Sequence, residues 1–394
     1  MQHLSCKVLV ISLVFLIIVT PGPARSSEQK SAANLPVVQS RRVSDTVRVS
    51  NEKPLANPAV NRLTQEIEPR PTWIPLDLHP SPPPRFGFSA TLNPINEVAI
   101  LFGGTLSTTG EANDTWLTDG FGWIQIETPH APEQRVHANM TYDEIRQEAV
   151  LFGGMDQQIL LGDTWTFNGT DWELRNPTLS PQARVGACMA YDADRNVVIL
   201  FGGIGDTGGE FWEELGDMWI WNGIDWEQQF PAHLPPVRAG ASMVFDRANH
   251  RLVLFGGAVG GGILDDTWSW DGSDWTEQHP AHHPPSRYEF GMAYDKWRQV
   301  VIIWGETYPI GFADTWAWDG IDWQIVQTFQ EPPENLWYMA RLVYLPQRQE
   351  VILFNDHRIK EYDDGGNIIY TEHMESWALT YQYLNYMPVI LTEP

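Results

Sequence analysis

An arginine recurs along this sequence at nearly regular intervals, and its side chain is a candidate for ligand chemistry. A guanidinium group donates several N–H bonds in a fixed plane, which suits carboxylate and phosphate groups. Several guanidinium groups brought to one place would therefore bind an anionic ligand. The structural alternative is that each arginine pairs with an aspartate of the repeat, such as Asp163 or Asp266, and joins neighbouring units. The arginines are Arg85, Arg135, Arg184, Arg238, Arg287 and Arg341.

A second group of candidates lies in segments of irregular length. One is an acidic and aromatic run within residues 204–216, and the other is a long connection between residues 323 and 341. Aromatic and charged side chains outside a repeat pattern are typical of surfaces that contact a protein or a carbohydrate. The candidate residues in these two segments are Phe211, Trp212, Glu213, Glu214, Trp337 and Tyr338.

The other chemistry-bearing residues favour neither a metal nor a cofactor. Histidines such as His130 and His233 are spread one per unit, whereas a metal needs three or four ligands around one ion. Cys188 lies among small apolar residues and is expected to be buried, without a disulfide partner. The sequence contains no serine-hydrolase elbow, no phosphate-binding glycine loop and no zinc signature. We therefore expect no metal and no cofactor.

Three sequence markers recur in phase and define the units that must position these residues. Leu-Phe-Gly-Gly stands at 101–104, 151–154, 200–203 and 254–257, with degenerate copies at 303–306 and 353–356. Asp-x-Trp stands at 114–116, 163–165, 217–219, 266–268 and 314–316. A second tryptophan, which we call the closing tryptophan, ends each unit at Trp123, Trp172, Trp226, Trp275 and Trp323.

Each unit is expected to form four short strands. The first follows the arginine, as in 240–245, and the second is an apolar run such as 197–201. Glycine pairs end the second strand because glycine adopts positive φ freely. The third strand carries Asp-x-Trp, and turns such as 168–171 lead into the fourth strand with its closing tryptophan. No segment of this region has helical periodicity.

The combination of Phe-Gly-Gly, Asp-Thr-Trp and a closing tryptophan resembles the kelch repeat, which is found in kelch-domain adaptors and in the central domain of galactose oxidase. The resemblance covers about residues 71 to 384. It implies an all-β fold, a β-propeller whose four-stranded blades pack radially around an axis. No motif allows the copper ligands of galactose oxidase to be assigned in this sequence, so the resemblance implies a non-catalytic member.

The spacing predicts six blades. Trp73 stands 12 residues before Arg85, as each closing tryptophan stands 12 residues before the next arginine up to Arg287. The last unit supplies only three strands, so the N-terminal strand at 72–77 is expected to complete it and close the ring. An alternative is that residues 381–386 supply the missing strand.

The two faces of such a propeller differ. Turns between strands 1 and 2 and between strands 3 and 4 are short and share one face. The Gly-Gly loops and the connections between blades share the other face, which holds the long segments 204–216, 323–341 and 356–375. The six arginines are expected at the mouth of the axial channel on this loop face, where binding is predicted.

The sequence ahead of the repeats predicts export. Residues 1–25 have a cationic start, a short apolar run and small residues at a cleavage site, as a signal peptide does, and an uncleaved anchor is the alternative. Residues 26–70 have the composition of a disordered linker, and 71–394 form the repeat domain. The net charge of −25 argues against nucleic-acid partners. A secreted or extracytoplasmic monomer is expected, with no membrane contact beyond the leader.

The functional prediction is a secreted binding module that presents its loop face to a protein or carbohydrate partner. An extracellular carbohydrate-active enzyme with a site at the channel mouth is the alternative. A purely architectural envelope or adhesion component, which needs no site, also fits the repeats.

Overall fold

The structure is a computed structural model and describes residues 70–106, 110–209, 212–307, 311, 313–333, 340–362 and 368–382. The predicted signal peptide and nearly all of the predicted linker lie outside these residues; Arg70 already belongs to the first strand. The described residues form strands, turns and loops and contain no helix, so they include no helix able to cross a membrane. The all-β prediction is confirmed.

Most of the described strands belong to six antiparallel sheets of four strands each. The first is β3 (Ser89–Asn93), β4 (Val98–Phe102), β7 (Thr115–Thr118) and β8 (Trp123–Ile126); the second is β9 (Asn139–Asp143), β10 (Glu148–Phe152), β13 (Thr164–Phe167) and β14 (Trp172–Arg175). The third is β16 (Cys188–Asp192), β17 (Val197–Phe201), β20 (Met218–Trp221) and β21 (Trp226–Gln229); the fourth is β22 (Ser242–Asp246), β23 (Arg251–Phe255), β26 (Thr267–Trp270) and β27 (Trp275–Gln278). The fifth is β28 (Gly291–Asp295), β29 (Val300–Glu306), β30 (Ala313–Trp318) and β31 (Trp323–Ile325); the sixth is β32 (Arg341–Leu345), β33 (Glu350–Tyr362), β34 (Ile368–Gln382) and β1 (Arg70–Leu76).

The four expected strands per unit are therefore confirmed, although the first strand expected at 240–245 is β22 at Ser242–Asp246. The predicted second strand at 197–201 coincides with β17. The third strands begin at the residue that follows the aspartate or include it, and the closing tryptophan is the first residue of each fourth strand from β8 to β31.

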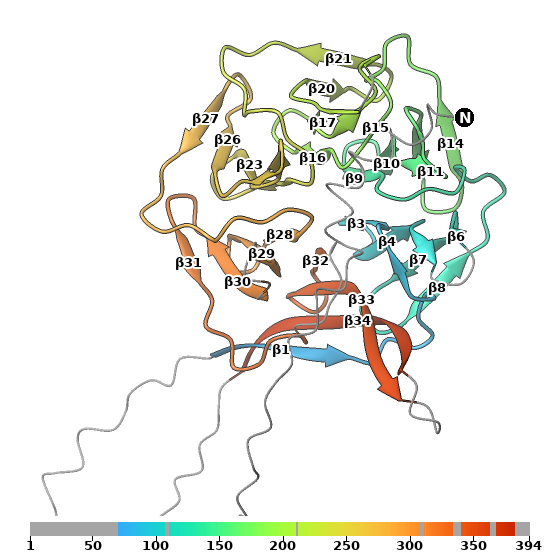
Figure 1. Ribbon diagram of the computed structural model, residues 1–394, viewed down its shortest axis with the longest axis vertical. Coiled ribbons are helices and arrows are strands. Elements are labelled where there is room, and N and C mark those ends of the chain that lie inside the picture. The colour runs from blue at the N-terminus through green and yellow to red at the C-terminus, as the bar shows by residue number, and fades with distance from the viewer. Residues whose placement is uncertain are drawn as a thin grey trace, which may run out of the picture.

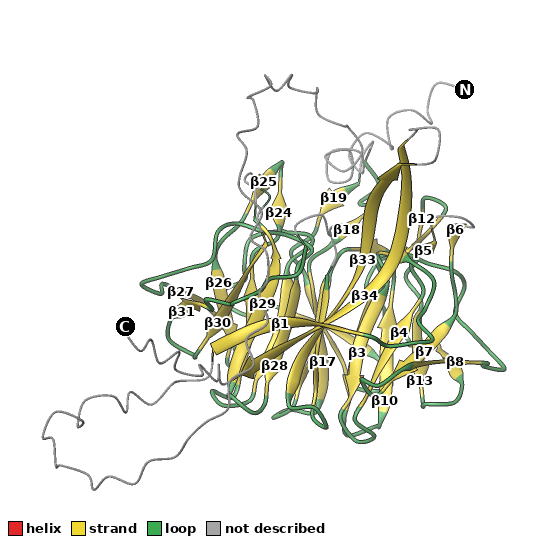
Figure 2. Ribbon diagram, turned by 90° about the horizontal axis from the view of Figure 1, so that it is seen from below, coloured by secondary structure: helices red, strands yellow, loops and turns green. Residues whose placement is uncertain are grey.

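Four small sheets lie on one side of the molecule, which we call the loop side (Figure 2). They are β2 (Arg85–Phe86) with β5 (Thr105–Leu106) and β6 (Gly110–Glu111); β11 (Met155–Asp156) with β12 (Ile159–Leu160); β15 (Arg184–Val185) with β18 (Ile204–Gly205) and β19 (Glu213–Glu214); and β24 (Ala258–Val259) with β25 (Gly262–Ile263). The long β33 and β34 project on the same side, so most of the irregular segment 356–375 extends these two strands. The opposite side, with the short turns, is the turn side.

The sheets lie around a common centre (Figure 1). The first strand of each sheet contacts the first strand of the next, from β3 through β9, β16, β22 and β28 to β32, and β32 contacts β3. A buried hydrophobic cluster fills the space between every two neighbouring sheets, including the sixth and the first. Packing against two neighbours removes both apolar faces of each sheet from water.

The N-terminal strand pairs with the C-terminal one. β1 runs antiparallel to β34, with Trp73 opposite Leu379. Tyr381, which the alternative assigned to the missing fourth strand, belongs to β34 and lies opposite Pro71. Trp73 is fully buried, and its Nε1 donates to Thr315 Oγ1 of the fifth sheet at 2.9 Å.

The same tryptophan contact recurs between other neighbouring sheets. Closing tryptophans 172, 226 and 323 each donate to the third-strand threonine of the preceding sheet, at 2.9 Å. Trp73 thus holds the position that a closing tryptophan holds elsewhere.

Candidate functional site

Five of the repeat arginines are enclosed within their own units. Arg184 donates to the carbonyl oxygens of Gln182 and Gly202 at 3.0 Å and to both carboxylate oxygens of Asp217 at 2.6 and 2.8 Å. Its side chain is 0% exposed. Burial alone would raise the pKa of Asp217, but the hydrogen bonds and charge of Arg184 outweigh it, and the pKa lies below its usual value. Arg85, Arg135 and Arg238 make the corresponding contacts, whereas Arg287 bonds one carboxylate oxygen of Asp314, at 2.7 Å.

These ion pairs join the segment that precedes the first strand to the third strand of the same sheet. The structural alternative had expected them to join neighbouring sheets. Neighbouring units are joined instead by the arginine backbone. The carbonyl oxygen of Arg238, for example, accepts from Gly203 N of the preceding unit at 2.8 Å, and Arg238 N donates to the Leu215 oxygen at 3.1 Å. The five guanidinium groups are therefore engaged in contacts that stabilise the fold.

Arg341 is not the sixth member of this set, and the expected ring of six arginines is wrong. Arg184 stands 17 residues before Phe201, whereas Arg341 stands only 13 before Phe354. In the sheets, Arg341 pairs with Phe354 as Cys188 pairs with Phe201. Arg341 therefore occupies a position on the first strand itself, where the other sheets have Ser89, Asn139, Cys188, Ser242 and Gly291.

Two more residues depart from the repeat just before the first strands. Gly87, Gly186 and Gly240 follow the arginine by two residues and have φ of 65°, 63° and 66°. His137 and Glu289 hold the same position with φ of 56° and 55°. A non-glycine residue in this left-handed region is strained, by about 1–3 kcal/mol. Such strain without a local need is typical of functional sites.

The three departures meet at the centre of the sheets. His137, Glu289 and Arg341 all line a cavity of about 140 Å³ that also touches all six first strands. This cavity lies at the ends where the first strands begin, which is the loop side. The three positions at which charged or titratable residues replace the usual residues of the repeat therefore lie around one cavity.

The protonation states at this cavity are set by burial. Burial lowers the pKa of His137 to about 3, with a smaller contribution from the charge of Arg341, so the imidazole is neutral at pH 7. Burial raises the pKa of Glu289 to about 7, against the opposing charge of Arg341. Glu289 Oε2 and Asn139 Nδ2 are buried and have no hydrogen-bond partner among the described residues.

A methionine collar separates this cavity from a larger one on the turn side. Met140, Met189, Met243 and Met292 occupy equivalent positions on successive first strands and line both cavities. The larger cavity measures about 460 Å³. Sequence reasoning directed attention to the loop face and missed this turn-side cavity.

Aromatic side chains line the turn-side cavity, including Tyr142, Tyr191 and Tyr294. Burial, together with neighbouring carboxylates, raises the pKa of Tyr142 to about 12, so its hydroxyl stays protonated. Arg247 of the fourth sheet forms an ion pair with Glu144 of the second, which places a charged contact at the mouth of this cavity.

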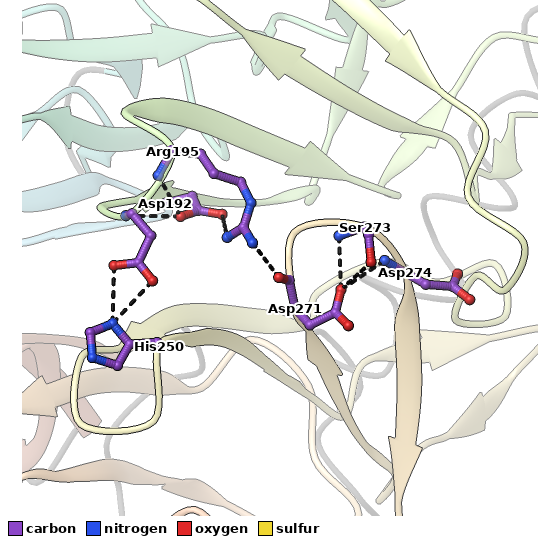
Figure 3. Close-up of polar contacts among 7 residues, drawn as sticks. Asp192, Arg195, His250, Asp271, Ser273 and Asp274 are labelled. Carbon is purple, nitrogen blue, oxygen red and sulfur yellow. Dashed lines mark hydrogen bonds and ion pairs between the residues drawn. The ribbon is translucent and has the colours of Figure 1, made fainter.

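Polar contacts hold the turns around that mouth in place. Asp192 Oδ2 accepts from Arg195 Nη1 at 3.0 Å, and Arg195 donates to the carbonyl oxygen of Asp271 in the fourth sheet (Figure 3). His250 Nδ1 lies 3.0 Å from Asp194 Oδ2. These hydrogen bonds and ion pairs join the third sheet to the fourth, so they stabilise the turn side.

The three loop candidates that the structure describes, Trp212, Glu213 and Glu214, do not line the loop-side cavity. Trp212 is 7% exposed and packs with Val185, Ile204 and Ala239 in a separate cluster, so it supports the loop rather than facing solvent. Glu213 is exposed on β19. Glu214 Oε1 accepts from Gly260 N at 3.1 Å. Phe211, Trp337 and Tyr338 lie outside the described residues.

The histidines and the cysteine have structural surroundings. His130, His233 and His282 each contact an aspartate of the next unit at 2.9, 2.7 and 2.8 Å. Burial raises the pKa of the Cys188 thiol to about 12. Within the described ranges, no three His, Cys, Asp or Glu side chains come together in a way that could hold a metal ion.

Sequence reasoning named Arg341 for the wrong reason and missed His137 and Glu289. The signals were present: a spacing of 13 instead of 17 residues, and two large residues where three other units have glycine. In comparisons with known proteins, no family model and no curated protein matches this chain.

Proposed function

We propose that this protein is an exported binding module built as a six-bladed kelch-type β-propeller. The six four-stranded sheets, the cycle of contacts between their first strands and the β1–β34 pairing support this architecture. The hydrogen bond from Trp73 to Thr315 supports β1 as the strand that closes the ring. The leader sequence supports a secreted or extracytoplasmic location.

The binding site of this module is the loop-side cavity. One observation carries the proposal: His137, Glu289 and Arg341, each a departure from the repeat, line the same cavity. The equivalent positions of other units, such as Gly186 and Cys188, line the same cavity with small side chains, so the three departures concentrate charged or titratable groups there. A ligand or a partner side chain that enters this cavity from the loop side would contact all three residues.

Binding is favoured over catalysis by the composition of this cavity. A carboxyl group with a pKa of about 7 is suited to general acid–base chemistry. Glycoside hydrolysis, however, needs two carboxyl groups flanking the bond. Glu289 is the one carboxylate among the described residues that line this cavity. The described lining of this cavity therefore offers one of the two carboxyl groups that glycoside hydrolysis needs.

The proposal is tested by screening the full chain against arrays of glycans and soluble extracellular proteins. Each ligand found is retested with Glu289→Gln and with Glu213→Gln, which makes the same change on exposed β19 outside the cavity. We expect Glu289→Gln to weaken binding at least tenfold and Glu213→Gln to leave it unchanged. Equal binding by both variants would place the ligand elsewhere and overturn the proposed site.

A further inference from the structure

Glu289 and Arg341 bring opposite charges to one small cavity without pairing directly. Each side chain is half-buried, and each is within range of the other's charge. Neither forms an ion pair with any described residue, whereas Arg287, two residues before Glu289, binds Asp314 at 2.7 Å. A charge taken out of water without a partner is costly, so a separated pair of charges is unusual in a folded protein.

The hydrogen-bonding capacity around these charges is also unused. Glu289 Oε2 and Asn139 Nδ2 are buried and have no partner among the described residues. Arg341 donates to the carbonyl oxygen of Ala340 at 3.2 Å, one bond for five N–H groups. One buried acceptor and one buried donor therefore have no partner in the described chain, and Arg341 beside them makes a single described hydrogen bond.

We propose that the loop-side cavity binds a compact zwitterion of the amino-acid type, with its ammonium group at Glu289 and its carboxylate at Arg341 and Asn139. This inference rests on the proposed function of the cavity as a binding site. Such a ligand supplies a counter-charge to each protein group at once and fills the unused hydrogen bonds. It is held between the two charges, so neither side chain has to move to meet the other.

Other ligand chemistries satisfy only part of the site. A simple anion pairs with Arg341 but is repelled by Glu289, and a simple cation meets the reverse problem. A neutral polyol offers hydrogen bonds but leaves both charges uncompensated. His137 adds no charge at neutral pH, because burial lowers its pKa to about 3.

The size and floor of the cavity restrict the ligand further. A dry cavity of about 150 Å³ accommodates benzene, so the 140 Å³ of this cavity corresponds to about six non-hydrogen atoms. Met140, Met189 and Met243 line the inner end and offer it apolar, polarisable surface. Glycine, alanine and β-alanine fit within this volume, so they are the probes that test the inference.

Calorimetric titration of the full chain at pH 8, above the pKa of about 7 of Glu289, tests the inference with this carboxyl group ionised. The probes are glycine, L-alanine and β-alanine, with acetate, ethylammonium and glycerol as partial mimics. We expect at least one of the three zwitterions to bind about tenfold or more tightly than every partial mimic. This comparison needs no variant, so it holds even if a substitution fails to fold.

Two variants then assign the charges. Glu289→Gln and Arg341→Gln should each raise Kd for the bound zwitterion about tenfold or more, and Glu213→Gln should not change it. Absence of zwitterion binding at 10 mM ligand, binding of acetate or glycerol with equal affinity, or unchanged affinity in both variants would overturn the inference.

Failure of this inference differs from failure of the proposed function. If no zwitterion binds but a ligand from the arrays binds and is lost with Glu289→Gln, the cavity is a binding site for another chemistry. If array ligands bind and are insensitive to Glu289→Gln, the site itself is wrong.

Discussion

Replacing Glu289 by glycine should stabilise the folded protein, and by more at pH 8 than at pH 4. Glu289 occupies a position where three other units have glycine, and it adopts φ of 55°. The substitution therefore restores the residue that this backbone favours. It also removes a half-buried carboxylate that has no ion-pair partner among the described residues.

Two contributions determine how much Glu289→Gly should stabilise the folded protein. Relief of left-handed strain contributes about 1–2 kcal/mol, of which roughly 0.5–1 kcal/mol is offset because glycine loses more backbone entropy on folding. Burial raises the pKa of Glu289 from 4.5 to about 7. At 1.36 kcal/mol per pKa unit, that shift corresponds to about 3 kcal/mol at full burial, and to about 1–2 kcal/mol for a half-buried group beside a cavity.

The sign with pH follows from the raised pKa. Below pH 4.5 the carboxyl group is protonated in both folded and unfolded chains, so its titration contributes nothing. As pH rises from 4.5 to 7, the unfolded chain ionises more readily, and the folded state loses stability. Glu289→Gly should therefore gain about 0.5–1 kcal/mol at pH 4 and about 2 kcal/mol at pH 8.

Urea denaturation of the full chain at the two pH values measures both contributions. Gly186→Ala is the matched control for the backbone, since Gly186 has φ of 63° and an added Cβ would approach no atom closer than 3.7 Å. It should destabilise by about 1 kcal/mol at either pH. A destabilised Glu289→Gly, or a gain independent of pH, would refute the attribution of strain and a burial cost to Glu289.

Three further substitutions test other parts of the structure. His137→Gly should show the opposite pH dependence: its gain in folding stability should grow as pH falls from 6.5 toward 3. The lowered pKa of His137 makes the unfolded chain the better proton acceptor in this range. Urea denaturation at pH 5 and at pH 8 measures the difference. Arg184→Lys should cost about 2–4 kcal/mol by urea denaturation, since lysine cannot reproduce the two-point contact with Asp217, and a cost near zero would make the pair dispensable. Trp73→Ala should cost about 3–5 kcal/mol in thermal unfolding, because Trp73 is fully buried and bonded to Thr315; an unchanged Tm would contradict its role in joining β1 to the fifth sheet.

The strands can be predicted from the sequence because each one is marked locally. Alternating and continuous apolar runs, glycine pairs and hairpin turns depend on neighbouring residues, so the predicted strand at 197–201 has the bounds of β17. The spacing of Trp73 likewise predicts the pairing of β1 with β34. These features follow from the periodicity that all units share.

The site cannot be predicted in the same way, because it consists of departures from that periodicity. Arg341 resembles a repeat arginine in the sequence, but its pairing with Phe354 places it further along, on the first strand itself. Trp212 lies outside the repeat, which favours a ligand-facing position, yet tertiary packing buries it. Which side chains share a cavity depends on contacts between units distant in sequence.

The pairing of β1 with β34 also has a consequence for the order in which the chain can be completed. Arg70 emerges early in synthesis but meets its partner Gln382 only after nearly the whole chain has followed. Until then the edges of β1 and β33 stay unpaired, and such edges invite association with other chains. A chain ended before Ile368 would retain five complete sheets and still carry two open edges, so we expect premature termination to produce aggregation rather than a smaller soluble domain.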